Sequence, residues 1–149
     1  WVFGLNAVGF VAAAQVNGRL LPAGSHERAM RAAQLVQAVA AIALVAATVT
    51  GAGGFAGIFV PIFVYVSCLG FIMPNAAALA MAPYGRNAGV ASALLGTLQF
   101  SLAAVASGLV GLLHDGSALP MAGTIAVFGL AGLAVNRLLT RAPRPATPT

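Results

Sequence analysis

Charged side chains are scarce in this chain. Only 6% of its 149 residues are Asp, Glu, Lys or Arg, whereas a typical globular domain has about 25%. So few charges cannot cover the surface of a water-soluble domain of this length, and that class is excluded. Disorder is excluded as well, because disordered chains combine low hydrophobicity with high net charge. The chain is 60% hydrophobic with a mean hydropathy of +0.98, so the lipid bilayer is its expected partner.

Lysine is absent, and acidic residues and cysteine are rare. The seven basic residues are all Arg and lie scattered in short connections. They form no basic stripe, so the net charge of +5 does not indicate nucleic-acid binding. Cys68 is the single cysteine of the chain, which excludes an intrachain disulfide and the ligand spacing of a zinc site. We therefore expect no metal and no cofactor.

Long apolar runs make up most of what is present. A membrane-spanning helix needs about 20 mostly apolar residues, and the chain has five such runs separated by Gly- and Pro-rich turns. No period-2 alternation is present, and backbone groups in lipid must be satisfied within a helix or a closed barrel. The sequence therefore predicts an all-α membrane protein, with a helical bundle over 1–141 and a disordered, Pro-rich cytoplasmic tail over 142–149. The predicted spans are 1–18, 29–50, 55–82, 88–113 and 118–138.

The arginines predict the orientation of these spans. They lie around the first connection, in the third connection and after the last span: Arg19, Arg28, Arg31, Arg86, Arg137, Arg141 and Arg144. Cytoplasmic loops are enriched in Lys and Arg, so we expect this side, with the C-terminus, to be cytoplasmic. An odd number of spans that starts outside predicts the C-terminal part of a longer protein.

No ionisable side chain is predicted at membrane depth. Glu27, Asp115, His26 and His114 all lie in or beside connections. Ionisable groups within membranes usually mark proton and ion sites, so we expect any proton-coupling group outside this chain. No acid–base pair or nucleophile set can be assembled, so an enzyme is not expected.

Neutral polar residues are therefore the candidates for a binding site. Asn6 and Phe10 lie on one face of the first span, together with Asn17, whose position near the end of the span indicates an interfacial residue. Pro61 and Pro74 interrupt the third span, and such breaks require protein or a cavity to satisfy the freed carbonyls. Polar and aromatic groups between and beside these prolines suit a ligand wall, although plain helix packing is the alternative. The third-span candidates are Tyr65, Ser67, Phe71 and Asn75.

The fourth span carries a stripe of small residues around one long polar side chain. Ser92, Gly96, Ala103 and Ser107 suit close helix packing. Gln99 belongs to the same stripe, and its length and central position favour a substrate cavity. The second and fifth spans have few polar groups, and we expect them to be peripheral and lipid-facing.

Three segments resemble one family of transporters. They are Phe3–Phe10 (FGLNAVGF), Met73–Met81 (MPNAAALAM) and Ala88–Phe100 (AGVASALLGTLQF). Together they are similar to the Bcr/CflA drug-resistance branch of the major facilitator superfamily, and the third is the most specific. The resemblance implies helices eight to twelve of a twelve-helix transporter in the bacterial inner membrane. The first connection lacks the Asp of the gating motif common in such transporters, so no gating pair is assigned.

The resemblance implies a function as well as a fold. It implies efflux of a small hydrophobic or amphipathic substrate, such as a drug or metabolite, by alternating access. Protons would be exchanged through the missing N-terminal half. Two alternatives remain: a major facilitator for an ordinary metabolite, and a non-transporting membrane scaffold or subunit.

Overall fold

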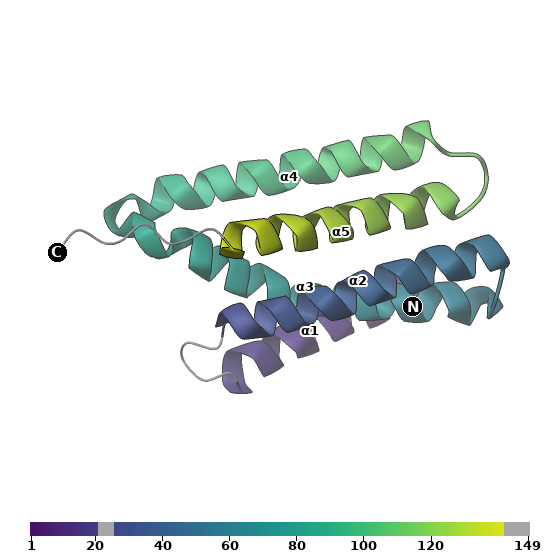
Figure 1. Cartoon of the computed structure of the whole chain (residues 1–149), viewed down its shortest axis with the longest axis horizontal. Helices are drawn as coiled ribbons and strands as arrows, with labels where there is room; N and C mark the ends of the chain where they lie inside the picture. Colours follow the sequence, from purple (N-terminus) through teal and green to yellow (C-terminus); the bar gives the residue numbers. More distant parts are fainter. Residues whose placement is uncertain (21–25, 142–149) are drawn as a thin grey trace.

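The fold consists of long helices, each of which runs in the opposite direction to the long helix before it (Figure 1). The computed structural model describes residues 1–20 and 26–141, and all regular structure in those ranges is helical. The predicted all-α membrane fold is confirmed. The predicted tail over 142–149 lies outside the described residues. The helices are α1 (Val2–Leu20), α2 (His26–Thr50), α3 (Gly54–Met81), the 3-10 helix η1 (Ala82–Asn87), α4 (Ala88–Leu112) and α5 (Leu119–Arg141).

Four of the five long helices, α2 to α5, are long and apolar enough to cross a membrane. The helix that falls short is α1, which has 19 residues and carries Asn6, Gln15, Asn17 and Arg19. A polar helix is tolerated in a membrane where its polar face packs against other helices. The structure meets that condition for Asn17, which is buried where α1 packs along α3, and in part for Asn6, whereas Gln15 and Arg19 are exposed.

The connections between helices are tight and rich in glycine. Gly51, Gly53 and Gly54 all have positive φ in the turn between α2 and α3, a conformation that side chains with a Cβ rarely adopt. Ser117 lies two residues before α5, and its hydroxyl oxygen accepts a hydrogen bond from the N–H of Leu119, the first residue of that helix, at 3.2 Å. The Ser117 hydroxyl and N–H both donate to Asp115, and these bonds lower the pKa of that carboxyl.

Packing is uneven among the helices. Helix α3 packs closely against both α1 and α2, α5 lies against α2, and α4 stands apart with no buried residue (Figure 1). Helix α2 carries the largest share of the buried residues, including Ala41 and Leu44, which are completely enclosed. The expectation that the second span faces lipid is therefore wrong for the face of α2 that carries Ala41 and Leu44. The physical reason is its run of alanines, which lets α3 and α5 approach from two sides.

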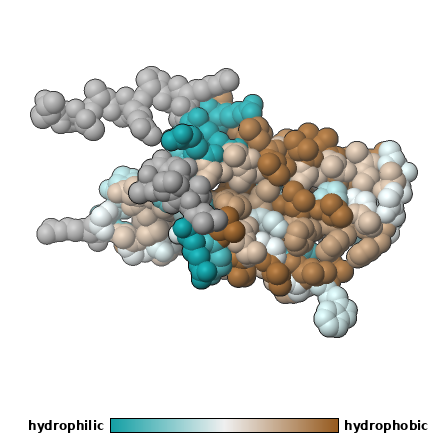
Figure 2. Space-filling model, turned by 90° about the horizontal axis from the view of Figure 1, so that it is seen from below, coloured by the Kyte–Doolittle hydropathy of each residue, from teal (hydrophilic) through white to brown (hydrophobic). Residues whose placement is uncertain are grey.

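The outer surface is apolar around the middle of the bundle (Figure 2). Large hydrophobic side chains such as Val39, Ile42, Val90 and Phe100 are more than half exposed. Hydrophilic residues gather toward one end of the face seen in Figure 2. We call the end of the bundle that holds η1, the end of α1 and the start of α2 the η1 end (Figure 1). This distribution suits a protein surrounded by lipid.

Candidate functional site

The contact between α1 and α3 brings together most of the predicted site residues. It is close because two glycines lack side chains at the crossing. A Cβ on Gly9 would lie 2.5 Å from the Ser67 hydroxyl oxygen, and a Cβ on Gly70 would lie 2.5 Å from the Phe10 carbonyl oxygen. Asn6, Phe10, Ser67, Phe71 and Asn75 are distributed along the two helices on either side of this crossing. We call this contact the α1–α3 seam.

Two polar atoms within the seam have no hydrogen-bond partner among the described residues. They are the Asn6 Oδ1 and Ser67 Oγ atoms, both buried. The Asn6 amide nitrogen is occupied, because it donates to the Val2 carbonyl at 3.0 Å. A buried polar group without a partner costs about 1–3 kcal/mol, so such groups usually have a functional or structural explanation. Both acceptors belong to the seam, so they are the polar groups of the seam that a donor from outside the described residues would meet.

A polar cluster holds the seam at the η1 end. The Asn75 amide nitrogen donates to Asn17 Oδ1 and to the Phe71 carbonyl, both at 2.7 Å. The Asn75 oxygen lies 2.7 Å from His26 Nδ1. Sequence reasoning selected Asn75 and treated Asn17 as interfacial, but it did not indicate that Asn17 is only 7% exposed and bonded to α3. It also missed His26, since hydropathy gives no indication that the first residue of α2 turns back onto α3.

The remaining third-span candidate, Tyr65, faces away from the seam. Its hydroxyl donates to the Ile125 carbonyl of α5 at 3.4 Å, and its ring lies against Gly129. A second polar contact on α5, from Asn136 to Gln34 of α2 at 2.5 Å, was not expected from the sequence. The Asn136–Gln34 pair could have been suspected from Gln34 and Gln37, which are one turn apart on α2. Both glutamines are buried.

The fourth-span residues lie on the exposed surface of α4. Gln99, Ser92, Ala103 and Ser107 are exposed, and a Cβ at Gly96 would meet open space. The described helices therefore supply no packing partner for this stripe. The roles predicted for Gln99 and for the small residues stay predictions.

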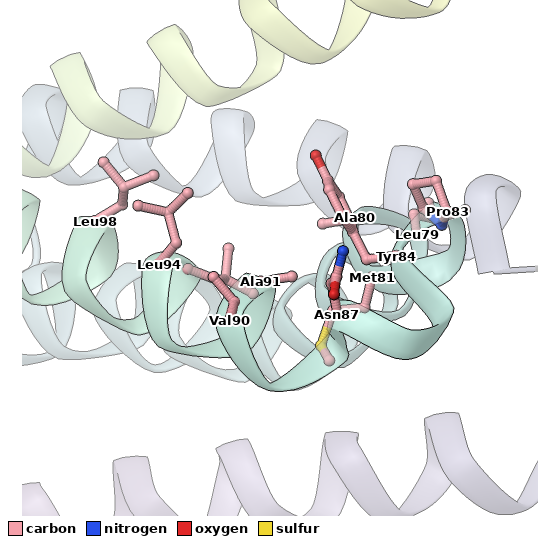
Figure 3. A pocket seen from close by; sticks show the side chains of 11 residues that line it. Leu79, Ala80, Met81, Pro83, Tyr84, Asn87, Val90, Ala91, Leu94 and Leu98 are labelled. Carbon is pink, nitrogen blue, oxygen red and sulfur yellow. The ribbon is translucent and has the colours of Figure 1, made fainter.

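A cavity of about 760 Å³ lies between the end of α3, η1 and the start of α4. Figure 3 shows Val90, Leu94 and Leu98 of α4 along one side, with Tyr84 and Asn87 of η1 near its end. The lining contains none of the residues predicted from the sequence. The sequence predicted a turn between the spans 55–82 and 88–113, which contains Pro83 and Gly85, but the cavity depends on the direction in which α4 leaves that turn, which is a tertiary feature. Its apolar walls suit an acyl or aromatic group.

Comparison with known proteins gives one informative similarity. The chain is similar to the uncharacterized MFS-type transporter YdgK of Bacillus subtilis (strain 168), with 30% identity over 138 residues. The match covers 87% of this chain and 34% of the relative, so the chain spans about a third of that protein's length. No family model and no solved structure matches the chain significantly. The similarity supports the major facilitator superfamily, and the apolar helices fit a fragment of a membrane transporter.

Proposed function

We propose that this chain is the C-terminal part of a major facilitator transporter of the Bcr/CflA drug-resistance branch. The similarity to an MFS-type transporter along 87% of the chain carries the superfamily part of the proposal. The branch rests on the resemblance of the segments Phe3–Phe10, Met73–Met81 and Ala88–Phe100. In this proposal α1 to α5 are helices eight to twelve of a multi-pass protein of the bacterial inner membrane, with the C-terminus in the cytoplasm. The complete protein exports a drug or small metabolite in exchange for protons, and it catalyses no chemical reaction.

In this proposal the α1–α3 seam forms one wall of the substrate path. Major facilitators bind substrate near the middle of the membrane between two halves that move against each other. Asn6 Oδ1 and Ser67 Oγ have no partner in the closed seam, so both atoms are free to accept hydrogen bonds once the seam opens. Phe10 and Phe71 are half-buried and supply apolar walls beside them.

The chemistry of the seam indicates the kind of substrate. Helices α1 and α3 together contain one charged residue, Arg19 near the end of α1. A site of amides, hydroxyls and aromatic rings suits a neutral or amphipathic solute with hydrogen-bond donors. We assign Gln99 to the opposite wall of the path, on α4. The proton-coupling residue is assigned to the rest of the transporter, because the seam offers no carboxylate or histidine at its centre.

The test uses the full-length protein in a host that lacks its own drug exporters. We expect Asn6→Ala and Ser67→Ala each to reduce efflux of a transported dye by about tenfold, which corresponds to the loss of one hydrogen bond of about 1.4 kcal/mol. Gln99→Ala should change which drugs are exported while the protein level in the membrane stays normal. Gln15→Ala is the control, because Gln15 is exposed on the same helix as Asn6.

Three outcomes would contradict the proposal in different ways. Normal dye efflux in all three variants would remove the seam and Gln99 from the substrate path. Transport of a metabolite without any drug would indicate an ordinary metabolite facilitator. If the purified full-length protein moves no solute in proteoliposomes, the scaffold interpretation is favoured.

A further inference from the structure

The polar cluster at the η1 end joins three helices through one side chain. Asn75 of α3 is 1% exposed, and it is bonded to Asn17 of α1 and to His26, the first residue of α2. It is the most enclosed polar side chain in the described part of the chain. We call these three residues the clasp.

The hydrogen bonds of the clasp have a fixed direction. The Phe71 carbonyl oxygen can only accept, so the Asn75 amide nitrogen, rather than its oxygen, must face it. The second amide hydrogen goes to Asn17 Oδ1. The Asn75 oxygen is then left for His26, whose Nδ1 must carry a hydrogen to donate to it. His26 therefore acts as a donor to the centre of the clasp in its neutral Nδ1–H form and in its charged form.

The clasp lies beside Pro74, one of the two prolines inside α3. Pro74 has no N–H, so α3 lacks one backbone hydrogen bond directly beside Asn75. One helical turn before Pro74, Gly70 lies against the backbone of α1 at Phe10 and Ala14. The part of α3 beyond Pro74 is thus able to bend away from α1, and the clasp opposes that movement.

The strength of the clasp suits a reversible contact. Hydrogen bonds between membrane helices shift an equilibrium by about threefold each on average. The two interhelical bonds of the clasp therefore favour the closed seam by about tenfold, which thermal motion overcomes readily. Water at the membrane surface can satisfy the same three side chains when they separate.

We infer that the His26–Asn75–Asn17 clasp is a latch that holds the α1–α3 seam closed at the η1 end and opens during the transport cycle. The inference rests on the proposed function for the cycle itself. The structural part, that the clasp controls opening of the seam, stands on the contacts alone. His26 and Asn17 are positioning residues that act through Asn75.

Cys68 provides a native reporter of opening. It is buried on α3, seven residues before Asn75, so both residues lie on the same face of the helix two turns apart. In the full-length protein with any other cysteine replaced, we measure the alkylation rate of Cys68 by a small, membrane-permeable maleimide without substrate. We expect Asn17→Ala and His26→Ala each to raise this rate about threefold, and the double variant about tenfold.

Three further variants separate a latch from general loosening. His26→Asn keeps an N–H donor at nearly the same position, so its rate should stay near that of the unchanged protein. Gln15→Ala, exposed on α1, and His114→Ala, exposed in the connection between α4 and α5, should leave the rate unchanged. Thermal unfolding of every variant in detergent is measured in parallel to identify misfolding.

The results distinguish the latch from the transport function. If Asn17→Ala and His26→Ala label at the unchanged rate while transport proceeds, the clasp is a static contact and the inference is overturned. If His26→Asn labels as fast as His26→Ala, the donor role is wrong and the inference is overturned. If labelling rises as expected but the protein moves no solute, the proposed function fails and the latch remains.

Discussion

At the residue scale, two asparagines of the α1–α3 seam show that identity alone does not fix a role. Asn75 has both amide hydrogens and its oxygen engaged, whereas Asn6 leaves its oxygen without a partner. The difference comes from neighbours on other helices. Asn75 meets Asn17 and His26, while no donor of the described residues reaches Asn6 Oδ1. These contacts are the basis on which we propose a latch role for Asn75 and a substrate contact for Asn6.

The seam also depends on residues that have no side chain. We expect Gly70→Ala to destabilise the protein by about 1–3 kcal/mol, because the new Cβ would lie 2.5 Å from the backbone oxygen of Phe10, which cannot move aside cheaply. Gly18→Ala on α1 meets open space and should be neutral or slightly stabilising. Equilibrium unfolding of both variants in detergent micelles measures the difference. Equal stability of the two variants would show that α1 and α3 are not in tight contact at Gly70.

At the element scale, α2 organises the bundle although its sequence indicates a peripheral helix. One face is lined by Ala33, Gln34, Gln37, Ala41 and Leu44, all buried. Small residues let α3 and α5 come close, and the buried glutamines need polar partners on those helices. Gln34 obtains one from Asn136 of α5.

The contact between Gln34 and Asn136 can be measured as a coupling energy. We expect a double-mutant cycle of Gln34→Leu and Asn136→Leu to give about 0.6 kcal/mol, with an upper value of about 1.7 kcal/mol. The control cycle pairs Asn136→Leu with Thr48→Val. Thr48 lies near the other end of α2 and donates to its own helix at Leu44, so those two changes should add. A coupling of zero in the first cycle would mean that α5 is not held to α2 through this pair.

At the scale of the whole molecule, the helices form one closely packed group and one outlying helix. Helices α1, α2, α3 and α5 share contacts, while α4 reaches the group mainly through its ends and along α5 (Figure 1). Its small-residue stripe and Gln99 therefore lie on open surface. In the transporter that we propose, other helices or the substrate path complete that surface.

The proposed orientation of the whole chain rests on the distribution of its arginines and can be tested directly. In the full-length protein, with Cys68 and any other cysteine replaced, we expect His114→Cys to react with a membrane-impermeant maleimide added outside right-side-out vesicles. The connection that holds His114 carries no arginine, and connections without arginine are expected outside. Arg19→Cys should react only after the vesicles are opened. The reverse pattern would invert the proposed topology.

The sequence by itself determined the helices, because the signals for them are local. Long apolar runs require helices in lipid, and glycine and proline mark their ends. The third predicted span, 55–82, differs from α3 by one residue at each end. The second begins three residues late, since the polar residues His26, Glu27 and Arg28 extend α2 beyond the apolar run.

Only the tertiary structure decided which helix faces meet. In the clasp, Asn75 is 49 positions from His26 and 58 positions from Asn17 in the sequence. Asn136 is 102 positions from its partner Gln34. Hydropathy cannot indicate such pairs, because it records how apolar a segment is and not which neighbour its polar face meets. For the same reason the burial of Asn17, the turn of Tyr65 toward α5 and the central place of α2 could not be predicted. They depend on how closely small residues let two helices approach.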